Sequence, residues 1–208
     1  MAKKRKITMY MADFETTVYD GQTSTEVWAA ALVKIGTEDV IIYHSIGDFL
    51  KAVEALSESN ESDVIVYFHN LKFDGTFILS YLLSTGLYRQ ALQQDRHGDY
   101  YFDEDKLLAN GQFKYMISDM GQWYEITLKY QGHFIRFRDS LKLLPFSVKK
   151  IGKDFKTKHQ KLEMEYKGYR YAGCEITPAE QEYIANDVLV VAEALQMMME
   201  RGHDKTTI

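Results

Sequence analysis

Residues 64–74 read VIVYFHNLKFD, a short apolar run that ends in polar residues. A nearly continuous apolar run of this length is typical of a strand buried on both faces, as in a parallel sheet. Residues 73–87, which follow, are largely apolar over a length that favours a helix. A buried strand that leads into a helix is a building unit of α/β domains. The stretch therefore predicts an α/β fold with a central strand over 64–68.

Three β-rich runs precede this unit, and turn residues separate them. Asp20-Gly21 and Gly36-Thr37 favour reversals of the chain, so the three runs are predicted to form an antiparallel meander. After the third run, apolar residues recur at helical spacing. The predicted elements are strands over 7–13, 26–35 and 39–44 and a helix over 45–58.

Residues 89–111 are polar and acidic, with an acidic centre at 103–106, and are predicted to be a mobile excursion from the fold. The residues beyond them have strand character, and two Gly-containing turns favour hairpins between the strands. The predicted strands cover 114–119, 123–130 and 133–139.

The last predicted element is a helix with well-marked ends. Thr177-Pro-Ala-Glu180 combines a capping box with proline at the first helical position, and Gly202 favours the end of the helix. The order of elements predicts an α/β domain with a mixed sheet flanked by helices, in the ribonuclease H-like arrangement, with an inserted β-hairpin region. At 208 residues, one domain over 1–208 is expected.

Composition and charge restrict the classes of function. The formal net charge is −5, which argues against a protein that grips duplex DNA through bulk positive charge. The single cysteine, Cys174, excludes an internal disulfide and fits a reducing compartment. No apolar run approaches the roughly 20 residues of a membrane span. A soluble cytoplasmic protein without membrane contact is therefore expected.

Local positive charge is concentrated between residues 142 and 161. Seven lysines lie there, interleaved with Phe146 and Phe155. Such a run forms either a solvated face or a track for single-stranded nucleic acid, in which aromatic rings stack on the bases. The run alone favours neither interpretation.

Two acidic segments in the first half of the chain carry candidate chemistry. Asp13 and Glu15 lie two residues apart at the end of a predicted strand, so both point to one face and can approach one ion. Asp74 follows the central strand at the start of a helix, with Asn70 four residues earlier. Each pair also has an ordinary explanation, the first as a solvated strand edge and the second as caps of a helix and a loop.

A third segment lies on the last predicted helix, where Tyr183 and Asp187 share one face. Apolar residues around them form a packing stripe, so Asp187 is expected at the edge of a buried surface. A carboxylate there needs a partner, and a metal ion suits it; a solvated carboxylate beside a core tyrosine is the ordinary alternative. Two-metal phosphodiesterases hold ions about 3.5–4 Å apart with carboxylates from different elements. The three acidic segments together would supply such a set.

The order Asp-x-Glu, Asn-x-x-Phe-Asp and Tyr-x-x-x-Asp resembles the three exonuclease motifs of the DEDD proofreading nucleases in their tyrosine-bearing form. Further segments narrow the resemblance to the exonuclease domain of the protein-primed family B DNA polymerases of small phages. These segments, which together extend over nearly the whole chain, read MADFETT, YFHNLKFDGTF, MGQWY, DSLKLLPF, VKKIGKDFK and ITPAEQEYIANDV.

The resemblance implies roles for the matching residues. Tyr183 would orient the attacking water, and Lys161, in a Lys-x-x-hydrophobic motif, would support the scissile phosphate. The ligands of two Mg²⁺ or Mn²⁺ ions would be Asp13, Glu15, Asp74 and Asp187, with the first two and the last holding one ion directly. The residues that would hold the single-stranded 3′ end are Thr16, Tyr67, Asn70, Phe73, Phe77, Ser140, Leu141, Phe146 and Tyr166.

Elementary chemistry agrees with these roles. Divalent ions activate water and neutralise charge that develops on the leaving oxygen. A tyrosine near neutral pH positions groups by hydrogen bonding rather than acting as a strong base. Aromatic rings stack on bases without choosing among them, which suits an enzyme that must accept every nucleotide.

The implied function is a 3′→5′ exodeoxyribonuclease that proofreads for a protein-primed phage replicative DNA polymerase. Its expected partners are single-stranded DNA, the polymerase domain of the same parent chain and the terminal (primer) protein, in the cytoplasm of a bacterial host. The chain ends at Ile208, soon after the third motif, so we expect an excised domain without the polymerase domain. Residues 95–112 look longer than the connection in the family.

Two alternatives stay open at this point. One is a free-standing DEDD exonuclease that acts on DNA or RNA. The other is a catalytically silent module that binds single strands or terminal protein.

Overall fold

Strand β4 (Asp63–Phe68) lies at the centre of the fold, between the parallel strands β1 (Ile7–Thr16) and β10 (His133–Asp139). All six residues of β4 are buried, as the apolar run predicted. The computed structural model describes residues 5–17, 19–94, 96–98, 100–102, 108–166 and 169–203.

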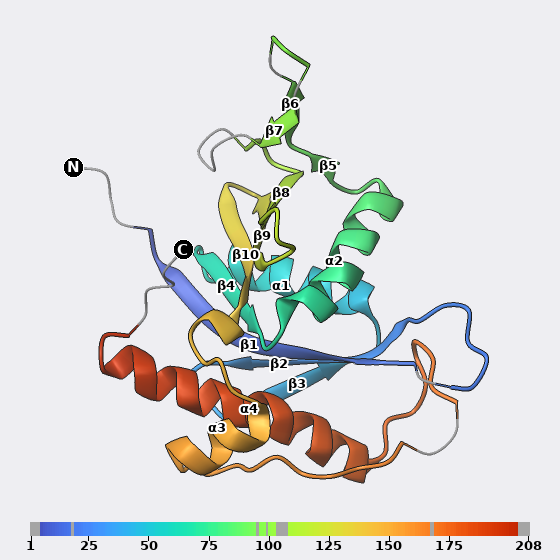
Figure 1. The fold of residues 1–208 in the computed structure, drawn as a ribbon, viewed down its shortest axis with the longest axis vertical. Coiled ribbons are helices and arrows are strands. Elements are labelled where there is room, and N and C mark those ends of the chain that lie inside the picture. Colours follow the sequence, from blue (N-terminus) through green and yellow to red (C-terminus); the bar gives the residue numbers. More distant parts are fainter. Residues whose placement is uncertain are drawn as a thin grey trace.

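One mixed sheet extends from β4 in both directions, in the order β3-β2-β1-β4-β10-β9-β8-β5 (Figure 1). On one side β1, β2 and β3 form the predicted antiparallel meander. On the other side β10, β9 and β8 are joined by antiparallel pairing, and β5 is parallel to β8. The outer strands are β2 (Val27–Lys34), β3 (Val40–Tyr43), β9 (Trp123–Tyr130), β8 (Gln112–Ile117) and β5 (Arg89–Gln90).

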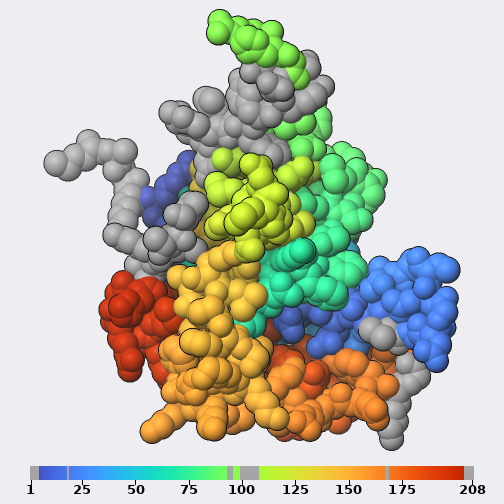
Figure 2. Space-filling model, in the orientation of Figure 1, coloured from blue at the N-terminus to red at the C-terminus, as the bar shows by residue number. Residues whose placement is uncertain are grey.

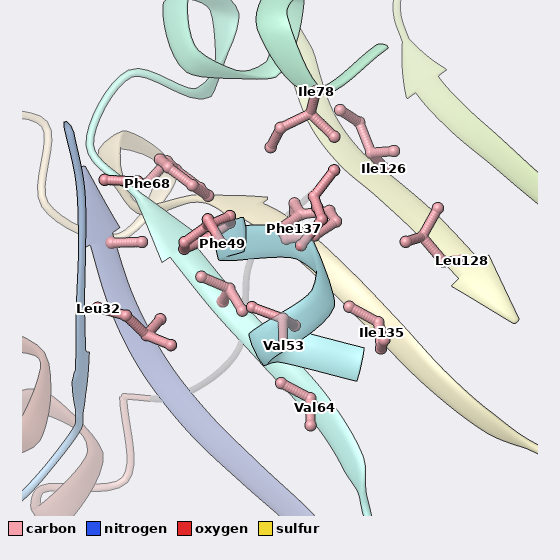
Figure 3. Close-up of a cluster of buried hydrophobic side chains, with 14 of the residues drawn as sticks. Leu32, Phe49, Val53, Val64, Phe68, Ile78, Ile126, Leu128, Ile135 and Phe137 are labelled. Atoms are coloured by element: carbon pink, nitrogen blue, oxygen red, sulfur yellow. The ribbon is translucent and has the colours of Figure 1, made fainter. Parts of the chain in front are cut away.

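Helices cover both faces of the sheet. Successive residues of β1 point to opposite faces, so they belong to two different cores. Tyr10, Ala12 and Phe14 belong to the core under α1 (Ile46–Ser59) and α2 (Leu71–Thr85), part of which Figure 3 shows around Phe49, Phe68 and Phe137. Met11 belongs to a second core with residues of α3 (Val148–Phe155) and α4 (Pro178–Glu200), below the sheet in Figure 1. The predicted class, a mixed α/β sheet flanked by helices, is confirmed.

Helix α4 begins with the predicted capping box. Thr177 Oγ1 accepts from the Glu180 backbone N–H, and the Glu180 carboxylate accepts from the Thr177 N–H at 2.8 Å. The helix ends at Arg201, followed by Gly202 at φ +79°, a left-handed conformation that glycine adopts at little cost. Among the described helices, none is long and apolar enough to cross a membrane.

The inserted region between α2 and β8 contains more regular structure than its polar composition suggests. β5 joins the main sheet, while β6 (Leu92–Gln94) and β7 (Tyr100–Phe102) form a separate antiparallel pair that projects from the body (Figure 1). These strands lie where the sequence predicted only a mobile excursion, whereas the predicted hairpins at 120–122 and 131–132 are those that join β8, β9 and β10. The acidic centre at 103–106 lies outside the described residues.

Besides β5, β6 and β7, two short helical elements have no counterpart among the predicted ones. The 3₁₀ helix η2 (Ser140–Lys142) follows β10 and is capped by Asp139, and α3 is capped by Ser147, whose hydroxyl accepts from the Lys150 N–H. Both are short, and α3 is rich in lysine, so apolar periodicity alone gives a weak signal there. Together, η2 and α3 connect β10 to the segment that carries Lys161.

Candidate active site

The three acidic segments meet at the carboxyl ends of the central parallel strands. The Phe14 N–H on β1 donates to Asp74 Oδ1 at 3.2 Å, which ties the first segment to the start of α2. The Asn70 N–H donates to Asp139 Oδ1 at the end of β10, also at 3.2 Å. Ligand sites of open α/β sheets lie at such strand ends. In Figure 2, blue atoms of the β1 region and red atoms of α4 are visible in a recess between teal α2 and the orange segment.

Asp13, Glu15 and Asp187 form an acidic cluster in which each residue offers one carboxylate oxygen, and these three oxygens lie within 4.8 Å of one another. Asp13 and Glu15 are alternate residues of β1 on the face that α4 covers, which explains why α4 brings Asp187 to them. Asp74, 2% exposed, lies beside this group on the α2 side. The structure thus brings together the four carboxylates predicted as metal ligands.

The cluster fits a hard divalent cation. Mg²⁺ is coordinated by oxygen atoms, including carboxylates, at about 2.0–2.1 Å, so ligand oxygens around one ion lie up to about 4.2 Å apart. The observed spread of the three carboxylates is close to that value. Asp187 Oδ1 is buried and has no hydrogen-bond partner among the described residues, which is costly for a carboxylate unless a cation is bound.

Burial and mutual repulsion disfavour the charged state of these groups. Burial raises the pKa of Asp13 well above its usual range, and the neighbouring Asp74, Glu15 and Asp187 raise it further. Burial likewise raises the pKa of Glu15 to about 7, and that of Asp74 to about 8 despite the N–H bond from Phe14. A bound cation would offset the cost of burying several negative charges together, so the carboxyl groups would release their protons.

The site therefore predicts a pH-dependent effect of metal on stability. Glu15 and Asp74 bind protons more tightly in the folded metal-free chain than in the unfolded chain, where carboxyl pKa values are about 4. Their contribution to stability is thus full below about pH 4 and is lost as the pH rises towards 8. Mg²⁺ takes the place of the protons, so the rise in melting temperature that it causes should grow from pH 5 to pH 8.

At pH 8 and free Mg²⁺ at 100 times its dissociation constant, we expect a rise of about 5–10 °C. Differential scanning calorimetry with Mg²⁺ and with EDTA measures it. The double variant Asp13→Ala/Asp187→Ala should show no rise, and the control Asp20→Ala/Asp39→Ala, at two exposed positions, should keep it. An equal rise in both double variants would contradict the proposed ligands.

Lys161 reaches into the same site from the segment after α3. Its Nζ donates to Tyr183 Oη at 2.8 Å and forms an ion pair with Asp187. Burial lowers the pKa of Lys161, but the bonds to Asp187 and Tyr183 outweigh this and raise it overall, so the amine is charged. The pKa of Tyr183 is raised by burial, so its phenol is neutral and its O–H is available as a donor.

Tyr166 packs at the inner wall of the site. Its ring lies edge-on to Trp28, with 5.1 Å between centroids, and to Tyr183, with 5.8 Å. Burial and then the charge of Glu15 raise the pKa of its hydroxyl. Tyr166 thus lies against the carboxylate cluster, and its contact with DNA stays a prediction.

The other residues predicted to hold DNA lie around the strand ends. Asn70 occupies the N-cap position of α2 in a left-handed conformation at φ 86°, but its side chain makes no capping bond. Asn70 and Leu141 line one pocket of about 350 Å³, and Asn70, Phe73 and Phe77 line another of about 340 Å³. Phe73 is 48% exposed, with its ring centroid 5.5 Å from that of Phe77. Open aromatic surface therefore flanks the acidic cluster.

Three members of the predicted DNA-binding set offer little exposed surface to DNA, and a fourth is exposed. Tyr67 and Ser140 are buried, and Thr16 is half-buried next to a β-bulge at the end of β1. Phe146 is exposed, with the Lys150 amine 5.1 Å from its ring centroid. The structure brings these residues to the same strand ends, but their contact with DNA stays a prediction.

Two further residues organise this region without having been singled out by the sequence. Asp139 Oδ1 accepts from the N–H groups of both Asn70 and Leu141. His69 bridges Phe146 O at 2.7 Å and Ser140 Oγ at 2.9 Å, and burial lowers its pKa. In the neutral ring Nε2 must donate to the carbonyl, so Nδ1 accepts from Ser140. The sequence did contain one indication of a role for His69 and Asp139, because each lies at the carboxyl end of a central strand.

The lysine run is largely paired with acidic or amide groups. Lys149 contacts Glu163, Lys150 contacts Asp154, and Lys142 Nζ donates to Gln122 Oε1 at 2.7 Å. These pairs lie at the surface. They reduce the net charge that this face offers to phosphate groups, whereas Lys161 points into the site.

Comparisons with known proteins agree with the fold and place the chain in a family. Residues 56–174 match the family described as DNA polymerase type B, organellar and viral. The DNA polymerases of Bacillus phage phi29 and Bacillus phage B103 are 40% and 38% identical over 208 and 206 residues, in each case 96% of this chain and 32% of the relative. The chain thus spans about a third of the length of these relatives.

Solved structures give the same result. Phi29 DNA polymerase complexed with primer-template DNA has a TM-score of 0.78 at 35% identity over 97% of this chain and 33% of that chain. The complex of the same polymerase with single-stranded DNA has a TM-score of 0.77 at 35% identity over 96% and 33%. The fold and its site therefore define a polymerase-associated α/β domain. The chain belongs to the organellar and viral type B DNA polymerase family, which confirms the predicted relationship to phage polymerases.

Proposed function

We propose that this chain is the proofreading 3′→5′ exonuclease domain of a protein-primed phage DNA polymerase and removes terminal nucleotides from single-stranded DNA. The observation that carries the proposal is the convergence of Asp13, Glu15 and Asp187, from two elements far apart in sequence, with Asp74 beside them. The solved complex of a relative, phi29 DNA polymerase, with single-stranded DNA supports the substrate class.

The chain's own residues supply binding and positioning in this mechanism. Asp13, Glu15, Asp74 and Asp187 would hold two Mg²⁺ or Mn²⁺ ions, which when bound lower the pKa of water and neutralise charge on the leaving oxygen. Tyr183, neutral and held by Lys161, offers its O–H to position the attacking water. The Lys161 ammonium, paired with Asp187, would support the scissile phosphate.

The test is degradation of 5′-labelled single-stranded DNA and RNA of one sequence, with Mg²⁺, Mn²⁺ or EDTA. We expect a ladder that shortens from the 3′ end of DNA with either metal and no cleavage in EDTA. A blocked 3′ end should prevent the reaction. Preference for RNA would favour the free-standing nuclease, and binding without cleavage in both metals would favour the silent module.

A binding prediction concerns the exposed ring of Phe73. Replacing it with alanine removes a surface on which a base can stack, which is worth roughly 1–3 kcal/mol and so about 5- to 150-fold in affinity. Phe73→Ala should weaken single-strand binding by this factor, measured by fluorescence anisotropy in Ca²⁺. Leu83→Ala is the matched control, because Leu83 is an exposed apolar residue of the same helix outside both pockets. Equal affinities of the two variants would refute the stacking role.

A further inference from the structure

The short segment between α3 and Lys161 is held by an unusual density of hydrogen bonds. After Lys156, in a left-handed conformation at φ 53°, the Thr157 N–H donates to Gly152 O. Gln160 Nε2 donates to Gly152 O at 3.2 Å and to Thr157 O at 2.7 Å, and Thr157 Oγ1 donates to His159 O at 2.6 Å. The four residues 157–160 therefore form a closed turn immediately before Lys161.

Glu193 of α4 joins this turn to the helix. Its Oε2 accepts from the Lys158 N–H at 2.6 Å and from the His159 N–H at 3.4 Å, and its Oε1 contacts His159 Nδ1. The side chains of His159 and Glu193 are 21% and 18% exposed, so this contact is partly shielded from solvent. A carboxylate that receives two backbone N–H groups constrains main chain, not only side chains.

The turn and Lys161 are thereby attached to α4 at two points. His159 lies against Glu193, and Lys161 lies against Tyr183 and Asp187. Asp187 and Glu193 are six residues apart, about 9 Å along a helix axis, and residues 159 and 161 are about 6.6 Å apart if extended. The segment therefore runs antiparallel to α4, with one attachment in the catalytic site and one outside it.

We propose that Glu193 is a positioning residue of the exonuclease reaction, which fixes the main chain at 158–159 so that the Lys161 ammonium reaches the catalytic site. The inference rests on the proposed function. Residues 161–166, on the other side of Lys161, form no helix or strand, so regular structure does not hold Lys161 from that side. A lysine side chain has several rotatable bonds, and its placement depends on where its Cα is held. Glu193 acts on the reaction through Lys161 and touches no reacting atom.

A matched set of variants tests this role. Glu193→Ala should reduce the single-turnover rate about 10- to 100-fold, as expected for a misplacement on the order of 1 Å. Glu193→Gln should recover most of the rate, because its amide oxygen still accepts the two N–H groups. Glu38→Ala is the control: Glu38 contacts the Lys158 side chain of the same turn in an exposed pair, and such pairs contribute little.

The distinguishing measurement is a double-mutant cycle with Lys161→Ile. If Glu193 acts through Lys161, Glu193→Ala should change the rate of the Lys161→Ile variant by less than about twofold. Affinity for single-stranded DNA in Ca²⁺ and the Mg²⁺-induced rise in melting temperature should stay as in the wild type. Hydrogen exchange at the Lys158 and His159 amides should become faster in Glu193→Ala.

The outcomes separate this inference from the proposed function. Additive losses in the double variant, an unchanged rate in Glu193→Ala, or no recovery in Glu193→Gln would overturn the role of Glu193 while leaving the nuclease in place. A loss of the Mg²⁺ response in Glu193→Ala would also overturn it, since the change would then reach the carboxylates. A wild-type protein that does not degrade single-stranded DNA would overturn both.

Discussion

Asp13→Ala should lower single-turnover cleavage of single-stranded DNA by about a thousandfold or more. Asp13 is central to the cluster, since Asp74, Glu15 and Asp187 all influence its pKa. In the proposed mechanism its loss removes a metal ligand and with it part of the stabilisation of transition-state charge, and several kcal/mol of lost stabilisation corresponds to this factor. Rapid-quench measurement with enzyme in excess over labelled DNA reports the chemical step directly.

The comparison with Phe73→Ala separates chemistry from substrate holding. Raising the enzyme concentration should restore much of the rate of Phe73→Ala, because that variant loses affinity, and should not restore Asp13→Ala. Asp20→Ala, at an exposed position in the loop after β1, serves as the control with a wild-type rate. The same degree of recovery in Phe73→Ala and Asp13→Ala would mean that the two roles have been assigned wrongly.

The second large effect is expected at Lys161. Lys161→Ile removes the ammonium that contacts Asp187 and Tyr183, so the hold on the phenol is lost together with the proposed support of the scissile phosphate. We expect the single-turnover rate at saturating enzyme to fall about 100-fold or more, as when an electrostatic donor is removed from an active site. Affinity for single-stranded DNA in Ca²⁺ should change little, because other lysines supply the general attraction.

Lys149→Ala is the matched control for charge. Lys149 is in an exposed pair with Glu163, outside the site. Its loss should weaken binding modestly, reduce the salt dependence of binding, and leave the rate at saturation near that of the wild type. If Lys161→Ile and Lys149→Ala had the same single-turnover rate, the catalytic role of Lys161 would have to be withdrawn, although the carboxylate site could stand.

Much of the fold could be predicted from local features of the sequence, namely apolar runs, helix caps and turn residues. The apolar run of β4 and the capping box of α4 predict those elements within one or two residues. Strands β9 and β10 agree with the prediction at both ends, because turn residues bracket them. Asp13 and Glu15 share a face as the period of a strand requires, and the structure adds that this is the face α4 covers.

Other features depend on tertiary contacts and could not be predicted from pattern. Helix α3 is short and carries three lysines, so its helical state relies on the Ser147 cap and on packing of Ile151 against α4. The roles of Asp139 and His69 arise from hydrogen bonds between segments about 70 residues apart. Propensity and periodicity describe neighbours in sequence and contain no information about such pairs.

The attachment of α4 to the sheet has a consequence for synthesis on the ribosome. Strands β1 and β2 are synthesised well before α4, yet the residues on one of their faces, such as Met11 and Trp28, are buried against that helix. Until residues 178–200 leave the exit tunnel, that face is an exposed apolar surface, which is the kind of surface through which nascent chains aggregate or recruit chaperones. Asp187 arrives with the same helix. A translating chain therefore completes the acidic cluster only when this apolar face is covered, and a fragment that stops before α4 lacks Asp187.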